Sequence, residues 1–192
     1  MHFAQRLDNV ETSAIRELFK LLGKPGIISF AGGFPDSAMF DVDGITQSSQ
    51  KALQENAGLA LQYGATEGFG PLREQLAAFM ATKGAKDVAP EQLIVTTGSQ
   101  QALDLLGKCM VSPGDKVIVE GPTFLATIQC FRLYGAEVIS APVDGNGVIV
   151  EELEKLIAEH QPKLVYLIPT FGNPSGATLS LERRKRVLEL AV

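Results

Sequence analysis

The residues best suited to chemistry lie where an apolar segment, Leu93 to Val95, leads through Gly98 into an amphipathic helix. The first turn of a helix leaves backbone N–H groups unpaired and carries the positive end of the helix dipole, so a phosphate placed there satisfies both. Gly98 lets a ligand approach the backbone, and the hydroxyl of Ser99 can cap the helix or bind a ligand oxygen. The pattern predicts an anion site. An ordinary strand, turn and capped helix is the alternative.

The elements that must position this site alternate between short apolar strands and amphipathic helices. The expected strands are 93–95, 116–120, 137–140 and 164–168, and the helices are 99 onward, 123–133, 151–160 and 181–192. Such alternation calls for a mostly parallel sheet covered on both faces, with ligands at the carboxyl ends of the strands. Upstream we expect a helix capped by Thr12 or Ser13, a strand at 27–30, helices at 44–56 and 71–82, and a loop at 62–68.

Composition narrows the class of protein. The chain has 192 residues, of which 45% are hydrophobic, and this is enough for a buried core. A net charge of −5 without a dense basic stretch gives no electrostatic basis for nucleic-acid binding. The sequence shows no membrane span and no apolar signal core, and its two cysteines form no C-x-x-C pair. We therefore expect a cytoplasmic protein that binds small molecules. The uncapped apolar end, Leu190 to Val192, leads us to expect the front part of a longer protein.

Five motifs follow one another in a defined order and spacing. They are Gly32-Gly33-x-Pro35, Tyr63-x4-Gly68-x3-Leu72-Arg73, Gly98-Ser99-Gln100-Gln101-Ala102, Glu120-x-Pro122-x-Phe124 and Pro169-x3-Asn173-Pro174-Ser175-Gly176. Together they resemble the fold-type I pyridoxal-phosphate aminotransferases of class I/II. The resemblance is greatest to the branch with 2-aminoadipate and kynurenine aminotransferases and the aminotransferase-like domain of MocR-type regulators. It runs from about Thr12 to Val192.

The resemblance implies the fold as well as the cofactor. It implies an α/β fold, namely the large domain of the fold-type I aminotransferases, with a mostly parallel sheet flanked by helices and truncated before its end. Residues 1–40 would belong to the small domain or N-terminal arm, and residues 41–192 to the incomplete cofactor-binding domain. It also implies cis peptide bonds before Pro174 and Pro122, which are a minority state of X-Pro bonds.

The resemblance assigns cofactor-binding roles within three of the motifs. The phosphate turn would consist of Gly98, Ser99 and Gln100. Phe124 matches an aromatic residue that stacks on the pyridine ring, and a core aromatic at a helix start is the alternative. Asn173 matches an asparagine that donates a hydrogen bond to the cofactor's phenolic oxygen and also borders the substrate. A turn asparagine before proline is the alternative.

Three further roles follow from the resemblance. Tyr63 matches a tyrosine that reaches the cofactor phosphate of the neighbouring subunit, which implies a homodimer; the alternative is a partly exposed loop tyrosine. Gly33 matches a glycine whose backbone touches the substrate, although a plain turn would also explain it. Arg16 matches an arginine that selects the substrate side chain and would suit acidic amino acids, and a solvated helix arginine is the alternative.

The family's remaining catalytic motifs are missing from this chain. An Asp that pairs with the pyridine nitrogen, a nearby Tyr, the Schiff-base Lys and an Arg for the α-carboxylate would all lie beyond Val192. Several lysines of this chain lie outside any motif of the family, so we do not assign the Schiff-base role to them: Lys20, Lys108, Lys116 and Lys163. We therefore expect no catalytic residue and no metal site here, weak or absent binding of pyridoxal phosphate, and an inactive fragment. Its parent would transfer an amino group from an amino acid to a 2-oxo acid, such as 2-oxoglutarate.

Two other classes of function remain open. A ligand-sensing domain of a MocR-type transcription regulator would need a helix-turn-helix domain upstream, for which a chain that opens with the aminotransferase-like helix leaves no room. A nucleotide-binding domain would need Gly-x-Gly-x-x-Gly after its first strand, and the turn at Gly98 lacks the other glycines.

Overall fold

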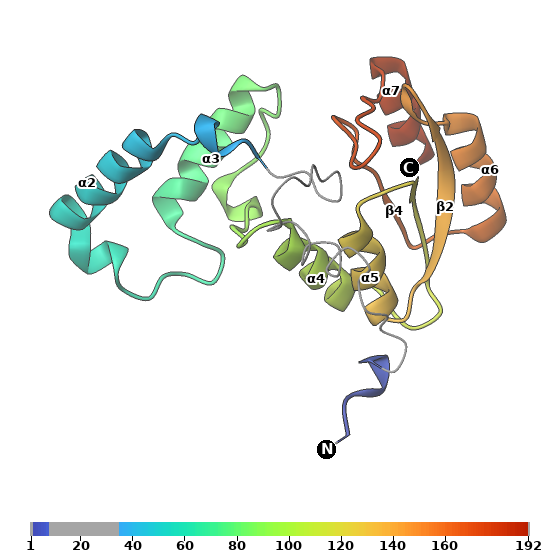
Figure 1. Ribbon diagram of the computed structural model, residues 1–192, viewed down its shortest axis with the longest axis horizontal. Coiled ribbons are helices and arrows are strands. Elements are labelled where there is room, and N and C mark those ends of the chain that lie inside the picture. Colours follow the sequence, from blue (N-terminus) through green and yellow to red (C-terminus); the bar gives the residue numbers. More distant parts are fainter. Residues whose placement is uncertain (1, 8–34, 192) are drawn as a thin grey trace, which may run out of the picture. The chain divides into compact units, whose positions relative to one another are not determined.

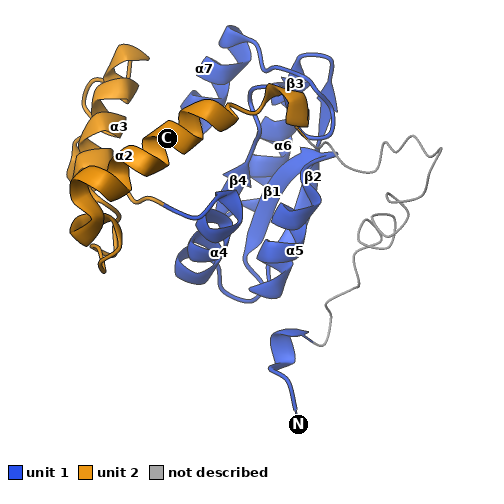
Figure 2. Cartoon of the chain, turned by 60° about the vertical axis from the view of Figure 1, so that its left-hand side comes forward, with its two compact units in different colours: residues 1–10, 96–192 blue, residues 11–95 orange. Residues whose placement is uncertain are grey.

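The computed structural model describes residues 2–7 and 35–191 (Figure 1). It divides into two compact units, one comprising residues 1–10 and 96–192 and the other residues 11–95 (Figure 2). A short 3-10 helix, η1 (Gln5–Leu7), lies near the N-terminus of the first unit. The helix expected after Thr12 or Ser13, the strand expected at 27–30, and the predicted site residues Arg16 and Gly33 lie outside the described residues.

The second unit is helical where the structure describes it. Its elements are η2 (Ser37–Met39), α2 (Val42–Ala60), α3 (Gly70–Thr82) and η3 (Pro90–Gln92). The Asp41 carboxylate caps α2 by accepting the Gly44 N–H at 2.9 Å, so this helix begins before the predicted residue 44. The helices expected at 44–56 and 71–82 and the loop at 62–68 are confirmed.

The prediction of a strand at 93–95 is wrong. These residues form no sheet ladder with any part of the chain that the structure describes. The Val95 N–H instead donates to the Glu67 carbonyl at 2.9 Å, and the Val95 side chain lies against Gly68, whose φ of 108° suits glycine. Within the described residues, the apolar segment is therefore held by a loop.

The first unit contains a four-stranded sheet in the order β3-β2-β1-β4. The strands are β1 (Lys116–Gly121), β2 (Glu137–Asp144), β3 (Gly147–Val148) and β4 (Leu164–Tyr166). β1 pairs in parallel with both β2 and β4, while β3 pairs antiparallel with β2. The expected mostly parallel sheet is thus confirmed, with β2 longer and β4 shorter than predicted.

Helices cover both faces of this sheet (Figures 1 and 2). They are α4 (Ser99–Met110), α5 (Leu125–Leu133), α6 (Val150–His160) and α7 (Leu181–Leu190). Alternate residues of β1 point to opposite faces, so Val117 and Val119 pack with Phe131 of α5 while Ile118 packs with Leu153 of α6. This double coverage explains the continuous apolar run in β1.

None of the helices in the described ranges, 2–7 and 35–191, combines the length and apolar character needed to cross a membrane.

Candidate functional site

The helices α4 and α5 both begin at the edge of the sheet where the parallel strands end. The last turn of α4 leads within a few residues into the start of β1, so the first turn of α4 lies toward the other end of that strand. Gly107 of α4 packs on the ring of Tyr134, the C-terminal cap residue of α5, and the Tyr134 hydroxyl donates to Asp104 Oδ1 at 2.6 Å. The two helices are therefore parallel neighbours, and their N-termini share the carboxyl edge (Figure 1).

The N-terminus of α4 presents the predicted anion-binding turn. Gly98 has φ 92° and ψ 170°, and a methyl group added to it would meet no atom within 4 Å. No side chain caps the helix, and the backbone N–H groups of Ser99 and Gln100 form no hydrogen bond with the described residues. Both side chains are exposed. These donors can therefore bind an anion from outside the unit.

A glutamine that the sequence reasoning missed holds this turn in shape. Gln101 Oε1 accepts both the Thr97 N–H, at 2.6 Å, and the Thr97 hydroxyl, at 2.9 Å. The Thr96 hydroxyl donates to the Gly98 carbonyl at 3.2 Å. Polar side chains next to a glycine turn were the available signal, but their pairing could not be read from spacing alone.

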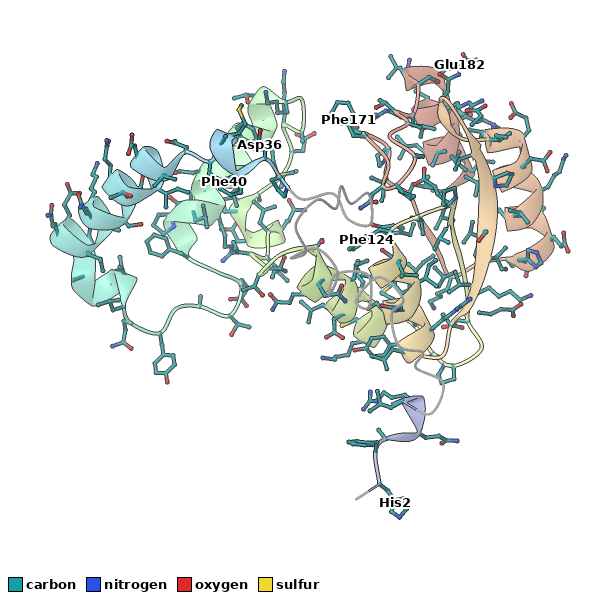
Figure 3. All side chains as sticks on the ribbon, viewed as in Figure 1. His2, Asp36, Phe40, Phe124, Phe171 and Glu182 are labelled. Carbon is teal, nitrogen blue, oxygen red and sulfur yellow. The ribbon has the colours of Figure 1, made fainter. Side chains whose placement is uncertain are left out.

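Phe124 lies at the N-cap of α5, directly after the loop that leaves β1 (Figure 3). Its side chain is half-buried, so part of the ring remains accessible. The cis bond expected before Pro122 is present in that loop. Next to Phe124, the hydroxyl of Thr123 is buried and forms no hydrogen bond with any described residue.

Asn173 lies in the loop of residues 169–179 that follows β4. The Asn173–Pro174 bond is cis, as expected. The Asn173 side chain is exposed, and its amide forms no hydrogen bond with the described residues. β4 is the parallel neighbour of β1, with Tyr166 opposite Val119, so the segments bearing Asn173 and Phe124 leave the same edge of the sheet. The structure thus brings Ser99, Gln100, Phe124 and Asn173 to one edge.

Glu120 is the buried charged residue of this edge. It follows the apolar residues of β1, and its Oε2 accepts the Ile168 N–H at 2.8 Å. Burial raises the pKa of the Glu120 carboxyl, and the hydrogen bond from Ile168 opposes that shift. This bond also explains why β4 is short, because the Ile168 N–H binds a side chain in place of a strand carbonyl.

The predicted residue Tyr63 belongs to the other unit. It lies in the loop between α2 and α3 and is 99% exposed. Its side chain is therefore accessible to another molecule.

The three lysines near the ends of α4, β1 and β4 do not lie at the carboxyl edge: Lys108, Lys116 and Lys163. Lys116 begins β1, and the Lys163 N–H donates to the Lys116 carbonyl at 2.7 Å. Lys108 is in the last turn of α4 and forms an ion pair with Asp104. β1 has six residues and is about 20 Å long at about 3.3 Å per residue, so these lysines are a strand length away.

The groups at the carboxyl edge fit pyridoxal phosphate by their chemistry. Free helix N–H groups and the Ser99 hydroxyl suit a phosphate dianion. The partly accessible ring of Phe124 suits a flat heterocycle, and the Asn173 amide can donate to an oxygen without titrating near neutral pH.

Comparison with known proteins supports the same interpretation of the site. A family model described as "Aminotransferase class I and II" matches residues 27–192. The chain is 42% identical over 195 residues to aromatic-amino-acid aminotransferase 1 of Thermococcus litoralis, covering 99% of this chain and 47% of that protein. It is 39% identical over 190 residues to 2-aminoadipate transaminase of Thermus thermophilus, covering 99% and 46% respectively.

A solved structure also matches over nearly the whole chain. LysN, the α-aminoadipate aminotransferase of Thermus thermophilus complexed with N-(5'-phosphopyridoxyl)-L-leucine, has a TM-score of 0.85 and 38% identity, covering 98% of this chain and 46% of that one. A more distant relative, the HTH-type transcriptional regulator YjiR of Escherichia coli, is 30% identical over 166 residues, or 86% of this chain and 35% of that protein. The chain spans about half the length of the aminotransferases it matches.

Proposed function

Because the chain belongs to the class I and II aminotransferases, we propose that it is the N-terminal, cofactor-binding part of a pyridoxal-phosphate-dependent aminotransferase. Its fold is that of the fold-type I large domain, as the resemblance implied. One observation carries the proposal: the first turns of α4 and α5 and the loop bearing Asn173 share one edge of a parallel sheet. The matched family does not support a nucleotide-binding domain.

The residues of this edge would divide the work of binding. Bound pyridoxal phosphate supplies an electron sink for removing an amino group from an amino acid and delivering it to a 2-oxo acid. The α4 N–H groups and the Ser99 hydroxyl would hold the phosphate. The Phe124 ring would cover one face of the pyridine and exclude water there. The Asn173 amide would donate to the ring oxygen and orient the group.

The proton transfer at the substrate α-carbon needs a base that these residues do not supply. Lys108, Lys116 and Lys163 lie at the amino edge of the sheet, and the described His160 ends α6 next to Lys163 at that same edge. Residues 1–192 alone would therefore be inactive.

The finer features are part of the same proposal. The amino acceptor would be a 2-oxo acid such as 2-oxoglutarate. Arg16 would favour acidic amino donors, and the Gly33 backbone would contact the substrate. Tyr63 would reach the neighbouring active site of a homodimer, which its full exposure permits. We place the protein in the cytoplasm. We assign residues 1–40 to the small domain or N-terminal arm and residues 41–192 to the large domain.

The test uses the complete gene product that carries these residues. We expect pyridoxal phosphate to give a long-wavelength absorbance band that bleaches when an amino donor is added. Ser99→Ala and Asn173→Ala should each weaken cofactor affinity about tenfold, as expected for a hydrogen bond to a charged or polarised group. The matched control is Ser112→Ala, an exposed serine in the turn before β1, which should leave affinity unchanged.

Two results would contradict the proposal. Equal affinity for pyridoxal phosphate in all three variants would show that cofactor binding does not depend on the residues of the carboxyl edge. Amino-group transfer by residues 1–192 alone, or a borohydride-trapped adduct at a unique lysine of this chain, would show that the chain contains its own catalytic lysine.

A second function is favoured by the similarity to the regulator YjiR. In that case the same edge would bind the cofactor as a sensor, and DNA binding would require a separate domain. Cofactor-dependent DNA binding without amino-group transfer in the complete gene product would favour the regulator over the enzyme.

A further inference from the structure

The loop of residues 169–179, here called the Asn173 loop, has little regular structure of its own. Its two ends are joined by one backbone bond, from the Leu179 N–H to the Pro169 carbonyl at 2.9 Å. Within the loop, the Gly172 N–H donates to the Ala177 carbonyl at 2.8 Å, and the Gly176 N–H donates to the Gly172 carbonyl. Three backbone bonds fix a loop of this length only loosely, so side-chain bonds from within the loop and from outside it contribute to its conformation.

Arg184 of α7 binds both ends of the Asn173 loop. Its Nε–H donates to the Leu179 carbonyl at 2.8 Å, and one terminal nitrogen donates to the Pro169 carbonyl and, at 2.8 Å, to the Thr170 hydroxyl. The guanidinium is half-buried and forms no ion pair with any described residue. Its side-chain hydrogen bonds to described residues, from Nε and one terminal nitrogen, thus all go to neutral acceptors of this loop.

Glu120 anchors the segment that enters the loop. The last residue of β1 paired with β4 is Val119, opposite Tyr166, so the backbone ladder has ended before Ile168. The Glu120 side chain extends the ladder by accepting the Ile168 N–H. Because this carboxylate belongs to the same strand end that leads to Phe124, it connects the two segments that carry the candidate site.

The backbone between these anchors is strained. Phe171 has φ 50°, in the left-handed region that is unfavourable for a bulky side chain, and it is 79% exposed (Figure 3). Its N–H donates to the Thr178 hydroxyl at 3.2 Å. A strained residue persists only where the surrounding bonds determine its conformation, and here those bonds come from Thr178 and Arg184.

We propose that Arg184 is a positioning residue that holds the Asn173 loop in its cofactor-binding conformation, with Glu120 as the fixed point on the opposite side. This inference rests on the proposed function only in giving Asn173 its role. Arg184 touches no ligand in this scheme; it acts on cofactor affinity through the backbone that carries Asn173.

The primary test is backbone hydrogen exchange on the 192-residue chain. In Arg184→Met we expect the Gly172 and Leu179 amides to exchange about tenfold faster, because local opening of the loop becomes easier. Arg184→Lys, which keeps the charge and some donors, should give a smaller increase. The β1 amides of Val117 and Val119 should change less than about twofold in both variants.

The matched control is Arg186→Met on the same helix. Arg186 is exposed and pairs with Glu154 at 2.8 Å and Glu189 at 3.1 Å, and it does not touch the loop. This variant should leave the Gly172 and Leu179 amides unchanged. Equal effects of Arg184→Met and Arg186→Met would overturn the proposal. So would unchanged loop exchange in both Arg184 variants. If Arg184→Met accelerates exchange throughout the unit, the Arg184→Lys variant decides between the two roles. Uniform acceleration of exchange in Arg184→Lys as well would show that Arg184 only stabilises the fold and would overturn the proposal.

Cofactor affinity in the complete gene product gives a second readout. Arg184→Lys should weaken pyridoxal phosphate binding in the wild-type background and have no effect in the Asn173→Ala background, since both changes remove the same contact. Additive losses would overturn the proposed route through Asn173. A wild-type protein that binds no pyridoxal phosphate would refute the proposed function, while the exchange experiment would still decide whether Arg184 positions the loop.

Discussion

Replacing Gly98 by alanine tests whether the α4 turn is built for an anion. Gly98 has φ 92° and ψ 170°, a region that is essentially restricted to glycine. An added methyl group would meet no atom within 4 Å, so Gly98→Ala introduces no clash with the described residues. The whole effect of the substitution must therefore come from the backbone or from a ligand that approaches it.

The expected cost is about 1–3 kcal/mol, the usual range for one non-glycine residue held in such a conformation. If the turn keeps its shape, the free energy of unfolding of the first unit falls by this amount. If the turn relaxes, the N–H groups of Ser99 and Gln100 move, and the cost appears as about 5- to 150-fold weaker cofactor binding. The two losses together should fall within the same range.

Urea unfolding of the chain measures the first loss, and titration of the complete gene product with pyridoxal phosphate measures the second. Gly114 provides a matched control, because its φ is 90° and a methyl group there also meets nothing within 4 Å. It lies in the turn between α4 and β1, at the amino edge of the sheet. Gly114→Ala should therefore reduce stability without changing cofactor affinity.

Two outcomes would refute this reasoning. If Gly98→Ala changes neither stability nor affinity, the positive φ is not required. If Gly98→Ala and Gly114→Ala weaken cofactor binding equally, the turn before Ser99 is not the phosphate site.

Two further predictions concern the framework. The Arg183 guanidinium donates to the Asp144 carboxylate at 2.7 Å and lowers the pKa of Asp144 from its usual 3.8 to about 2. The pair therefore stabilises the fold above about pH 4, and this contribution is lost as the pH falls toward 2. The difference in unfolding midpoint between wild type and Asp144→Asn should shrink over that window, and a pH-independent difference would contradict it. Phe131 is 2% exposed and meets Tyr166 edge-on at 6.4 Å, so Phe131→Ala should lower the free energy of unfolding by about 3–5 kcal/mol in urea. A loss below about 1 kcal/mol would mean that the cavity collapses.

The sheet strands could be predicted where burial on both faces requires a continuous run of apolar residues. Val117, Ile118 and Val119 are fully buried, and such a run occurs when helices cover both sides of a strand. The segment 93–95 carries a similar apolar run, yet it forms no ladder in the described part of the chain. A strand requires a partner, and the composition of one segment does not contain that partner.

The short strand β3 has no such apolar run and could not be predicted from the sequence. It has only two residues, and Gly147 stands in it because a side chain there would collide with Leu179. Arg183 donates to the Gly147 and Val148 carbonyls at 3.3 and 3.2 Å, which fastens β3 to α7. A contact between residues so distant in sequence, made to backbone carbonyls, has no periodic pattern that could predict it.

The residues of the candidate site could be predicted from the sequence, whereas the residues that hold the site in place could not. Ser99, Phe124 and Asn173 were predicted from sequence motifs, because a bound ligand would constrain the type of side chain at each position. Glu120 and Arg184 were not assigned roles, because they bind the Ile168 N–H and the carbonyls of Pro169 and Leu179. Every residue offers a carbonyl, and all except proline offer an N–H, so the acceptor or donor leaves no signal in the sequence.

This difference bears on what the parallel sheet contributes. Parallel strands end at one edge, so helices and loops that follow them meet there whatever their own sequences are. Topology alone therefore brings Phe124 and Asn173 to the same edge, but it fixes the edge and not the angle at which an amide faces its ligand. That angle depends on bonds such as those of Arg184 and Glu120 to the loop backbone. If the exchange experiment shows that the Asn173 loop keeps its protection without Arg184, topology and the loop's own backbone bonds would be sufficient by themselves.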